Sequence, residues 1–201
     1  MRPAGEGVTV PAGELLPCVV QDADTGRVLM LAYVDAEALD ATRRTGLAHF
    51  HSRSRGRLWQ KGETSGNVLR VAEIRADCDA DALLYLAHPA GPTCHTGSAS
   101  CFGDAAPVLA ELADVVAERA RSGDQASYVA GLIAAERERA QRKVGEEAVE
   151  VLLAAPGSDH LVAEVADLWF HSMLLLARDG LDPLAPLAEL RRRRGAPRRA
   201  G

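Results

Sequence analysis

The spacing of hydrophobic residues changes near residue 105, and this change limits the folds open to the chain. Before that point, short apolar runs alternate with Gly, Thr and Ser, a pattern typical of strands bounded by turns. After it, apolar residues recur at helical spacing over most of the sequence. We therefore predict an α+β protein. Its N-terminal domain, residues 1–105, is expected to be mainly β with short helices, and its C-terminal domain, residues 106–201, to be an all-α helical bundle.

Three apolar runs in the N-terminal half predict strands, at residues 16–20, 28–34 and 68–74. Residues 22–26 lie between the first two runs and are typical of a hairpin turn. A short helix is expected over residues 35–45, because Asp35 suits its N-cap and Gly46 suits its end. The pattern of residues 82–88 fits a strand or a helix equally well, so both alternatives stay open.

The C-terminal half predicts four helices, over residues 107–121, 127–155, 159–178 and 184–193. A basic run, Arg191–Arg194, is followed by Arg198 and Arg199 among Gly, Ala and Pro at the extreme C-terminus. A frayed, solvated tail is the expected structure there, disordered from about residue 194. No internal repeat is visible.

Composition excludes several classes of protein. The formal net charge of −5 argues against broad electrostatic binding of nucleic acid. No signal-peptide pattern is found, and the apolar runs are too short to cross a bilayer, so we expect a cytoplasmic protein without membrane partners. In a reducing compartment, cysteines that cluster with Asp and His favour metal binding over disulfides.

The densest group of metal-ligating residues lies between residues 77 and 101. It combines three alternating aspartates with three cysteines and a histidine: Asp77, Asp79, Asp81, Cys78, Cys94, Cys101 and His95. Taken singly, a cysteine is usually a small hydrophobic residue and an Asp-rich turn is usually solvated. Together within 25 residues they favour metal binding. Thiolates suit zinc and carboxylates suit magnesium, and three protein ligands on zinc leave the open position of a catalytic site. Cys18 lies in a separate apolar run and is expected in the core.

A second feature, residues 50–67, combines basic side chains with glycines. Arg53, Arg55 and Lys61 offer donors suited to phosphate, and Gly62 and Gly66 allow a close approach of the backbone to a ligand. The alternative interpretation is a solvated basic hairpin with an ordinary turn.

Two predicted helices carry carboxylates at spacings of three and four residues. Glu146, Glu147 and Glu150 follow Lys143 on one helix, and Glu164 and Asp167 lie on the next. Like charges on neighbouring helical strips repel one another unless a cation lies among them. Carboxylate oxygens favour magnesium, which often arrives with phosphate. The alternative is a solvated Glu-rich surface.

Residues 13–103 resemble the phosphoribosyl-AMP cyclohydrolase family, through the 50–67 segment, the Asp-Cys-Asp-x-Asp cluster, Cys94-His95-Thr-Gly97 and Ser100-Cys101-Phe102. The resemblance implies opening of the adenine ring between N1 and C6. It also implies zinc on Cys78, Cys94 and Cys101, magnesium on Asp77, Asp79 and Asp81, and a homodimer. In that dimer Cys78 of one chain completes the zinc site of the other.

Roles for other residues in this half follow as hypotheses. His95 is the candidate proton shuttle, because it adjoins a zinc ligand. Lys61 and Glu63 complete the predicted catalytic set, with Glu63 placed to contact ribose hydroxyls or the base. The predicted substrate-binding residues of the whole chain are Arg53, Ser54, Arg55, Trp59, Ser65 and Lys143.

Residues 108–193 resemble phosphoribosyl-ATP pyrophosphohydrolase, a relative of the all-helical MazG pyrophosphohydrolases. The shared features are Ser127-Tyr128, Lys143, the Glu-Glu-x-x-Glu and Glu-x-x-Asp motifs, and Trp169-Phe170-His171. The resemblance implies hydrolysis of the α–β phosphoanhydride, with magnesium on Glu146, Glu147, Glu150, Glu164 and Asp167. Ala135-Glu136 replaces a Lys-Gly step usual in that family, which removes a cation and puts full activity of this half in question.

The two resemblances together predict a bifunctional histidine-biosynthesis enzyme acting on phosphoribosyl adenine nucleotides, because the product of the second activity is the substrate of the first. One alternative keeps the cyclohydrolase and assigns the helical half to dimerisation alone. A protein of another class, a zinc-stabilised binding module without catalysis, would need metal to fold but would show no turnover.

Overall fold

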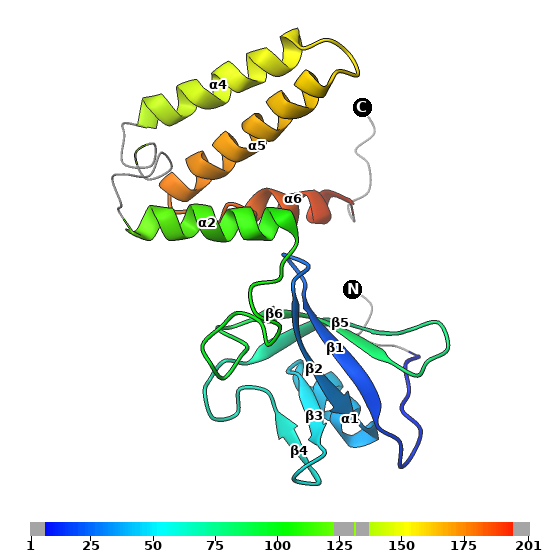
Figure 1. The fold of residues 1–201 in the computed structure, drawn as a ribbon. Helices are drawn as coiled ribbons and strands as arrows, with labels where there is room; N and C mark the ends of the chain where they lie inside the picture. The colour runs from blue at the N-terminus through cyan, green and yellow to red at the C-terminus, as the bar shows by residue number, and fades with distance from the viewer. Residues whose placement is uncertain (1–6, 123–130, 132–136, 195–201) are drawn as a thin grey trace. The chain divides into compact units, whose positions relative to one another are not determined.

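The computed structural model describes residues 7–122, 131 and 137–194. The chain forms two compact units, residues 1–107 and residues 108–201, and each is described by itself (Figure 1). The first unit is built on a β-sheet and the second on helices, so the predicted α+β class is confirmed.

A six-stranded sheet forms the framework of the first unit, in the order β4-β3-β2-β1-β6-β5. Neighbouring strands are antiparallel, except that β1 and β6 run parallel. The segment whose pattern fitted strand or helix is the strand β6, because it hydrogen-bonds on both sides, to β1 and to β5. The strands are β1 (Leu16–Asp22), β2 (Val28–Val34), β3 (His49–Ser52), β4 (Arg57–Gln60), β5 (Leu69–Ala76) and β6 (Leu83–Pro89).

The sheet curves back on itself, so that β5 meets the segment just before β3. The Ala48 amide donates to the Leu69 carbonyl at 2.9 Å, and the Val71 amide donates to the Gly46 carbonyl at 2.8 Å. Helix α1 (Ala36–Thr45) precedes this junction. As predicted, Asp35 caps it by accepting from the Ala38 amide at 2.8 Å, and Gly46 ends it with φ 71°.

The core of this unit combines side chains from nearly every strand with α1. Phe50 lies against Tyr85, with ring centroids 5.9 Å apart, and both are fully buried. Cys18 is buried in this core as predicted, and burial raises the pKa of its thiol. The predicted hairpin turn is also confirmed: Asp22 Oδ1 accepts from the Asp24 and Thr25 amides between β1 and β2.

The second unit contains the helices α2 (Val108–Ser122), α4 (Arg137–Leu153), α5 (Asp159–Arg178) and α6 (Ala185–Arg194). Helix α5 packs against α4 and α2, and Val116 and Leu174 are buried together (Figure 1). Helix α4 covers the last part of the helix predicted over 127–155. Ser127-Tyr128 and Ala135-Glu136 lie outside the described residues.

Arg191–Arg194 form the last turn of α6, which agrees with the helix predicted over residues 184–193 to within one residue at each end. Glu189 accepts from Arg192 and Arg193 at 2.7 Å each, and these pairs at helical spacing hold the turn. The side chains are exposed, as expected of a solvated run. Residues 195–201 lie outside the described part of the chain.

One helix among the described residues, α5, is long and apolar enough to cross a membrane by length and composition alone. Core helices pass the same test, and α5 packs against two other helices of its unit. It also carries a buried glutamate and a buried histidine, Glu164 and His171.

Two candidate active sites

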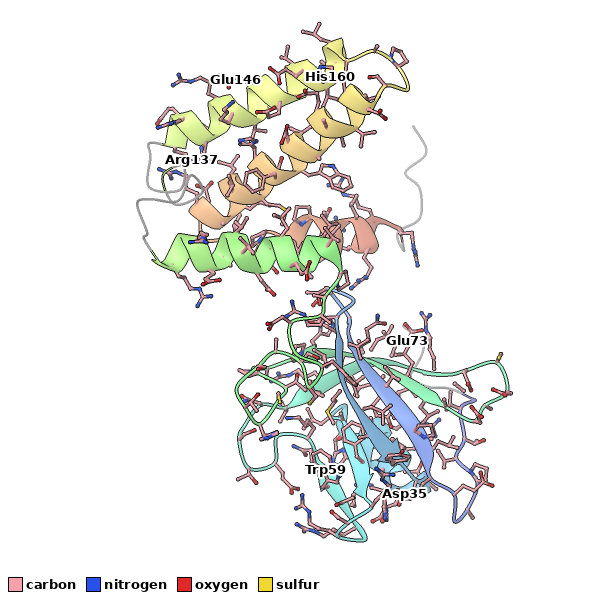
Figure 2. The ribbon with its side chains drawn as sticks, viewed as in Figure 1. Asp35, Trp59, Glu73, Arg137, Glu146 and His160 are labelled. Carbon is pink, nitrogen blue, oxygen red and sulfur yellow. The ribbon has the colours of Figure 1, made fainter. Side chains whose placement is uncertain are left out.

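A cleft of about 570 Å³ in the first unit brings together two segments that lie far apart in the sequence. One wall comes from β4 and the loop that follows it, and the other comes from the loop after β6. Trp59, on β4, is labelled in Figure 2. Eight of the predicted site residues line this cleft: Arg55, Trp59, Lys61, Glu63, Ser65, Cys94, His95 and Cys101.

The first wall depends on a tight turn that only glycine can form at one position. Gly62 has φ +83°, and a Cβ there would lie 2.5 Å from the backbone carbonyl of Asn67. The Gly66 amide closes the turn by donating to the Gly62 carbonyl at 2.9 Å. Gly91 serves the other wall in a similar way, because a Cβ there would lie 2.5 Å from Asn67 Oδ1. The two walls therefore meet closely around Asn67.

The second wall is fastened to β2. The Cys101 amide donates to the Leu29 carbonyl at 2.8 Å, and Ser100 Oγ donates to the Val28 carbonyl at 2.7 Å. Cys94 begins a tight turn in which its own amide donates to the Ser98 carbonyl at 3.0 Å. These backbone bonds hold the two cysteines at fixed places in the cleft.

The two thiols differ in their electrostatic surroundings. The pKa of Cys94 is lowered, first by a hydrogen bond from the Thr96 hydroxyl and then by the Thr96 backbone N–H. The pKa of Cys101 is raised, first by burial and then by the charge of Cys94. His95 lies beside them, with Nδ1 3.7 Å from Cys94 Sγ. Thiolate formation is therefore favoured at Cys94, and a cation between the two sulfurs would favour it at both.

Six residues predicted for this half do not line the cleft of the single chain: Arg53, Ser54, Asp77, Cys78, Asp79 and Asp81. Arg53 and Ser54 lie in the turn between β3 and β4, where the Arg53 guanidinium sits 3.9 Å from the centre of the Tyr33 ring. Strands β3 and β4 pair antiparallel on either side of this turn, so the segment forms a hairpin here.

The three aspartates gather in the turn between β5 and β6, and their carboxylate oxygens lie within 4.8 Å of one another. Asp77 Oδ1 accepts from the Ala82 amide at 3.1 Å, the main reason that the pKa of Asp77 is lowered. The pKa of Asp81 is raised, first by its hydrogen bond to Asp77 and then by the charges of Asp79 and Asp77. This repulsion would be relieved by a bound cation.

Cys78 is exposed in the same turn, which precedes β6, whereas Cys94 lies in the loop that follows β6. Strand β6 has seven residues and therefore spans roughly 20 Å. Within one chain, Cys78 is thus separated from the cysteine-lined cleft by the length of a strand.

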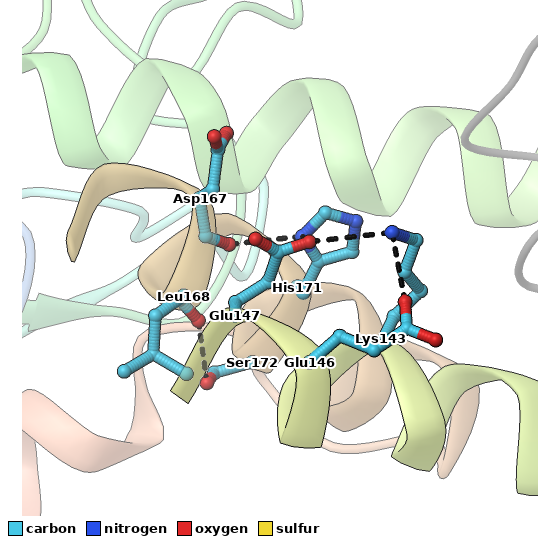
Figure 3. A network of polar contacts seen from close by, with 7 residues as sticks. All are labelled: Lys143, Glu146, Glu147, Asp167, Leu168, His171 and Ser172. Atoms are coloured by element: carbon cyan, nitrogen blue, oxygen red, sulfur yellow. Dashed lines mark hydrogen bonds and ion pairs between the residues drawn. The ribbon is translucent and has the colours of Figure 1, made fainter. Parts of the chain in front are cut away.

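The second site lies between α4 and α5. Carboxylate oxygens of Glu147, Glu164 and Asp167 all come within 4.8 Å of one another. Figure 3 draws two of the three, Glu147 and Asp167. Glu147 and Glu164 are buried, and among the described residues Glu164 Oε2 has no hydrogen-bond partner. An unpartnered buried carboxylate oxygen is costly, so this arrangement suits a cation that would complete it.

Lys143 and His171 surround this cluster (Figure 3). Lys143 Nζ lies 3.4 Å from Glu147 Oε1 and 3.0 Å from Glu146 Oε2, and both contacts raise the pKa of the lysine. His171 Nδ1 donates to the Asp167 carbonyl at 2.9 Å and lies 3.7 Å from Glu147 Oε1. His171 was absent from the predicted site set, although its four-residue spacing from Asp167 places both on one helical face.

His160, which was also absent from the predicted set, has its Nδ1 3.1 Å from Glu164 Oε1. It precedes Glu164 by four residues, the same helical spacing that signalled the carboxylates. Figure 2 labels it near the start of α5.

Glu146 and Glu150 are not part of the carboxylate cluster. Both are exposed on α4 and line a separate hollow of about 570 Å³ with Arg142, Gly145, Val149 and Leu153 (Figure 2 labels Glu146). The reason is helical geometry, since adjacent residues such as Glu146 and Glu147 point about 100° apart. The structure therefore places the five predicted carboxylates in two groups.

A curved β domain with a cleft of cysteine, histidine and basic side chains, together with a helical pair holding buried carboxylates, defines a hydrolase with two sites. Comparison with known sequences agrees. A sequence model of the phosphoribosyl-AMP cyclohydrolase family matches residues 30–103, and one of the phosphoribosyl-ATP pyrophosphohydrolase family matches residues 109–194.

Similar proteins extend over nearly the whole chain. The histidine biosynthesis bifunctional protein HisIE of Escherichia coli K12 is 48% identical over 184 residues, 89% of this chain and 91% of that protein. HisIE of Xylella fastidiosa is 52% identical over 171 residues, 83% of this chain and 82% of that protein. The chain belongs to the HisIE family of bifunctional histidine-biosynthesis proteins. It is a hydrolase with phosphoribosyl-AMP cyclohydrolase and phosphoribosyl-ATP pyrophosphohydrolase parts.

Proposed function

We propose that each unit is the domain for one of two consecutive reactions. The carboxylate cluster between α4 and α5 hydrolyses phosphoribosyl-ATP to phosphoribosyl-AMP and pyrophosphate, and the cleft of the first unit then opens the adenine ring between N1 and C6. The observation that carries the second assignment is the meeting of Cys94, His95 and Cys101 with Arg55, Lys61 and Glu63 in one cleft. We expect both reactions to occur in the cytoplasm.

Zinc fits the cysteines of the cleft. Two sulfurs that interact with each other, one of lowered and one of raised pKa, form a donor set that a soft cation would satisfy. When bound by Cys78, Cys94 and Cys101, zinc would supply a water of lowered pKa close to C6 of the substrate. Because Cys78 lies a strand length away in its own chain, we propose that it comes from the second chain of a homodimer.

The chain's own residues then bind the substrate and move protons. Arg55 and Lys61, at the rim and wall of the cleft, would hold phosphate groups, with Trp59 and Ser65 beside them. Glu63 would contact ribose hydroxyls or the base. His95 would carry the proton between the attacking water and the departing ring nitrogen. Arg53 and Ser54 would reach the substrate from the neighbouring hairpin turn.

Magnesium fits the exposed aspartates 77, 79 and 81, whose mutual repulsion it would relieve. We propose that this ion acts beside the second chain's zinc site, because the same turn carries Cys78.

Magnesium also fits Glu147, Glu164 and Asp167, since it would occupy the place that the unpartnered Glu164 Oε2 leaves open. The ion would neutralise charge on the triphosphate and position the attacking water. Lys143 would approach the phosphates, and His171 would hold Glu147 in place. Glu146 and Glu150 lie outside this group, and we propose that they contribute to a further ion on the exposed strip of α4.

Crossed substitutions test the assignment of one reaction to each site. Cys94→Ser should reduce ring opening at least 100-fold and leave pyrophosphate release within twofold of wild type, because the sulfur ligand is lost. Glu164→Gln should have the opposite effect, because a metal ligand is lost from the other site. The measurements are phosphoribosyl-AMP ring opening and magnesium-dependent pyrophosphate release from phosphoribosyl-ATP.

Glu138→Gln is the control for the second substitution, because Glu138 is an exposed residue in the first turn of α4. Ring opening and pyrophosphate release falling together in either variant would contradict the assignment. Wild-type chain that opens the ring but releases no pyrophosphate would favour a helical half that serves dimerisation alone.

A further inference from the structure

The turn that begins at Cys94 carries two hydroxyl groups that the proposed reaction does not use. Thr96 Oγ1 lies 3.2 Å from Cys94 Sγ and 3.2 Å from Ser98 Oγ. The turn is closed by two backbone bonds, from Cys94 to the Ser98 carbonyl at 3.0 Å and from Gly97 to the Cys94 carbonyl at 3.1 Å. The three side chains therefore sit in a row, with Thr96 in the middle.

The direction of these hydrogen bonds follows from the number of protons. A hydroxyl has one proton to donate. Thr96 donates its proton to the cysteine sulfur, so Ser98 must be the donor to Thr96. Hydrogen bonds in such a chain strengthen one another, and a donor aimed at sulfur restricts the direction in which its lone pairs point.

Thr96 contributes little to the packing of the unit. Its side chain is exposed, and it belongs neither to the buried core of the unit nor to the residues that line the cleft. Its described polar contacts are those to Cys94 and Ser98. A role in packing would require burial, whereas a role in orienting the sulfur requires only the contact that is present.

We propose that Thr96, backed by Ser98, is a positioning residue that holds the Cys94 sulfur for metal binding. The inference rests on the proposed zinc site and deepens it. Outer partners of this kind orient a ligand before the metal arrives, and their removal commonly weakens metal binding 10- to 100-fold.

The test compares zinc affinity among full-length variants, measured by competition with a chromophoric chelator. Thr96→Val removes the hydroxyl but keeps the shape, and it should weaken zinc binding about 10- to 100-fold. Thr96→Ser keeps the hydroxyl and should bind zinc within threefold of wild type. Ser98→Ala should lose less zinc affinity than Thr96→Val, because it removes only the hydrogen bond from Ser98 to Thr96 and keeps the one from Thr96 to Cys94.

Thr9→Val is the matched control, since Thr9 is exposed in the same unit and lies outside the cleft lining. Thermal unfolding of each metal-free variant should match that of wild type, which separates positioning from folding. Equal zinc affinity of Thr96→Val and wild type would overturn the inference and leave the proposed function standing. Wild type that binds no zinc would overturn the proposed zinc site itself.

Discussion

At the scale of single residues, each candidate site has a position where an atom or a described partner is absent. Gly62 and Gly91 have no Cβ where Asn67 must pass, and this absence lets the two walls meet. Glu164 has a buried oxygen without a described partner, and this absence leaves a place for a cation. We expect both features to lower the stability of the protein without its ligands.

Substitution of Gly62 tests the first of these features. Gly62→Ala should destabilise the protein by roughly 1–3 kcal/mol through its positive φ, and further through the clash of its Cβ with the Asn67 backbone. Gly66→Ala is the control, because Gly66 has φ +77° in the same turn but open space around its Cβ. Urea unfolding gives both values, and equal losses would contradict the close approach.

Neutralising Glu164 tests the second feature through stability. In the presence of a chelator, the free energy of unfolding of Glu164→Gln should exceed that of wild type by about 1 kcal/mol, because the substitution removes a charge from a crowded carboxylate cluster. In magnesium the order should reverse, because the wild type gains the energy of ion binding. Unfolding of both proteins with and without magnesium measures this, and an order that magnesium does not change would argue against an ion at this cluster.

At the scale of elements, an ion pair joins the first turn of α4 to the end of α5. Arg137 donates to both oxygens of Asp179, with the shortest contact 2.8 Å long. The hydrogen bonds from Arg137 lower the pKa of Asp179 in the folded protein. The pair therefore helps to set the mutual alignment of the two helices that supply the carboxylates.

The pH dependence of this pair has a definite sign. A carboxylate with a lowered folded pKa adds stability above its unfolded value, here 3.8, and that stability is lost as pH falls through the folded pKa. Wild type should thus exceed Asp179→Asn in stability at pH 6, and the difference should shrink as pH falls below 3.8 and disappear below the folded pKa of Asp179. Both side chains reach solvent, so the difference should also shrink in high salt. A difference that grows on acidification would contradict the pairing.

At the scale of the whole molecule, the position of Cys78 supports the proposal that two chains contribute to one zinc site. A mixture of two inactive variants tests this. Cys78→Ser chains keep Cys94 and Cys101, and Cys94→Ser chains keep Cys78. If sites form between chains, equal amounts unfolded and refolded together should recover about a quarter of wild-type ring opening, because half the dimers are mixed and each has one intact site.

The control for this experiment is each variant refolded alone, which should stay inactive. A zinc site formed within one chain would leave the mixture as inactive as its parts. Pyrophosphate release, which we assign to the carboxylate cluster of the second unit, should be unchanged throughout.

The sequence by itself determined whatever depends on near neighbours. Asp35 and Gly46 marked the ends of α1, helical spacing located α5, and the run at residues 77–81 marked an acidic turn, because caps, periods and turns are short-range properties. The resemblances added the two activities. These features survive in the structure with boundaries shifted by a residue or two.

Only the tertiary structure decided what depends on distant partners. Residues 82–88 belong to a strand, β6, because β1 and β5 pair with it on either side. The cleft exists because the curved sheet brings residues 55–65 close to Cys94. The structure also shows that Glu146 and Glu150 lie apart from Glu147, and that Cys78 lies apart from Cys94 and Cys101. Pairing and register join residues tens of positions apart, and no local pattern records them.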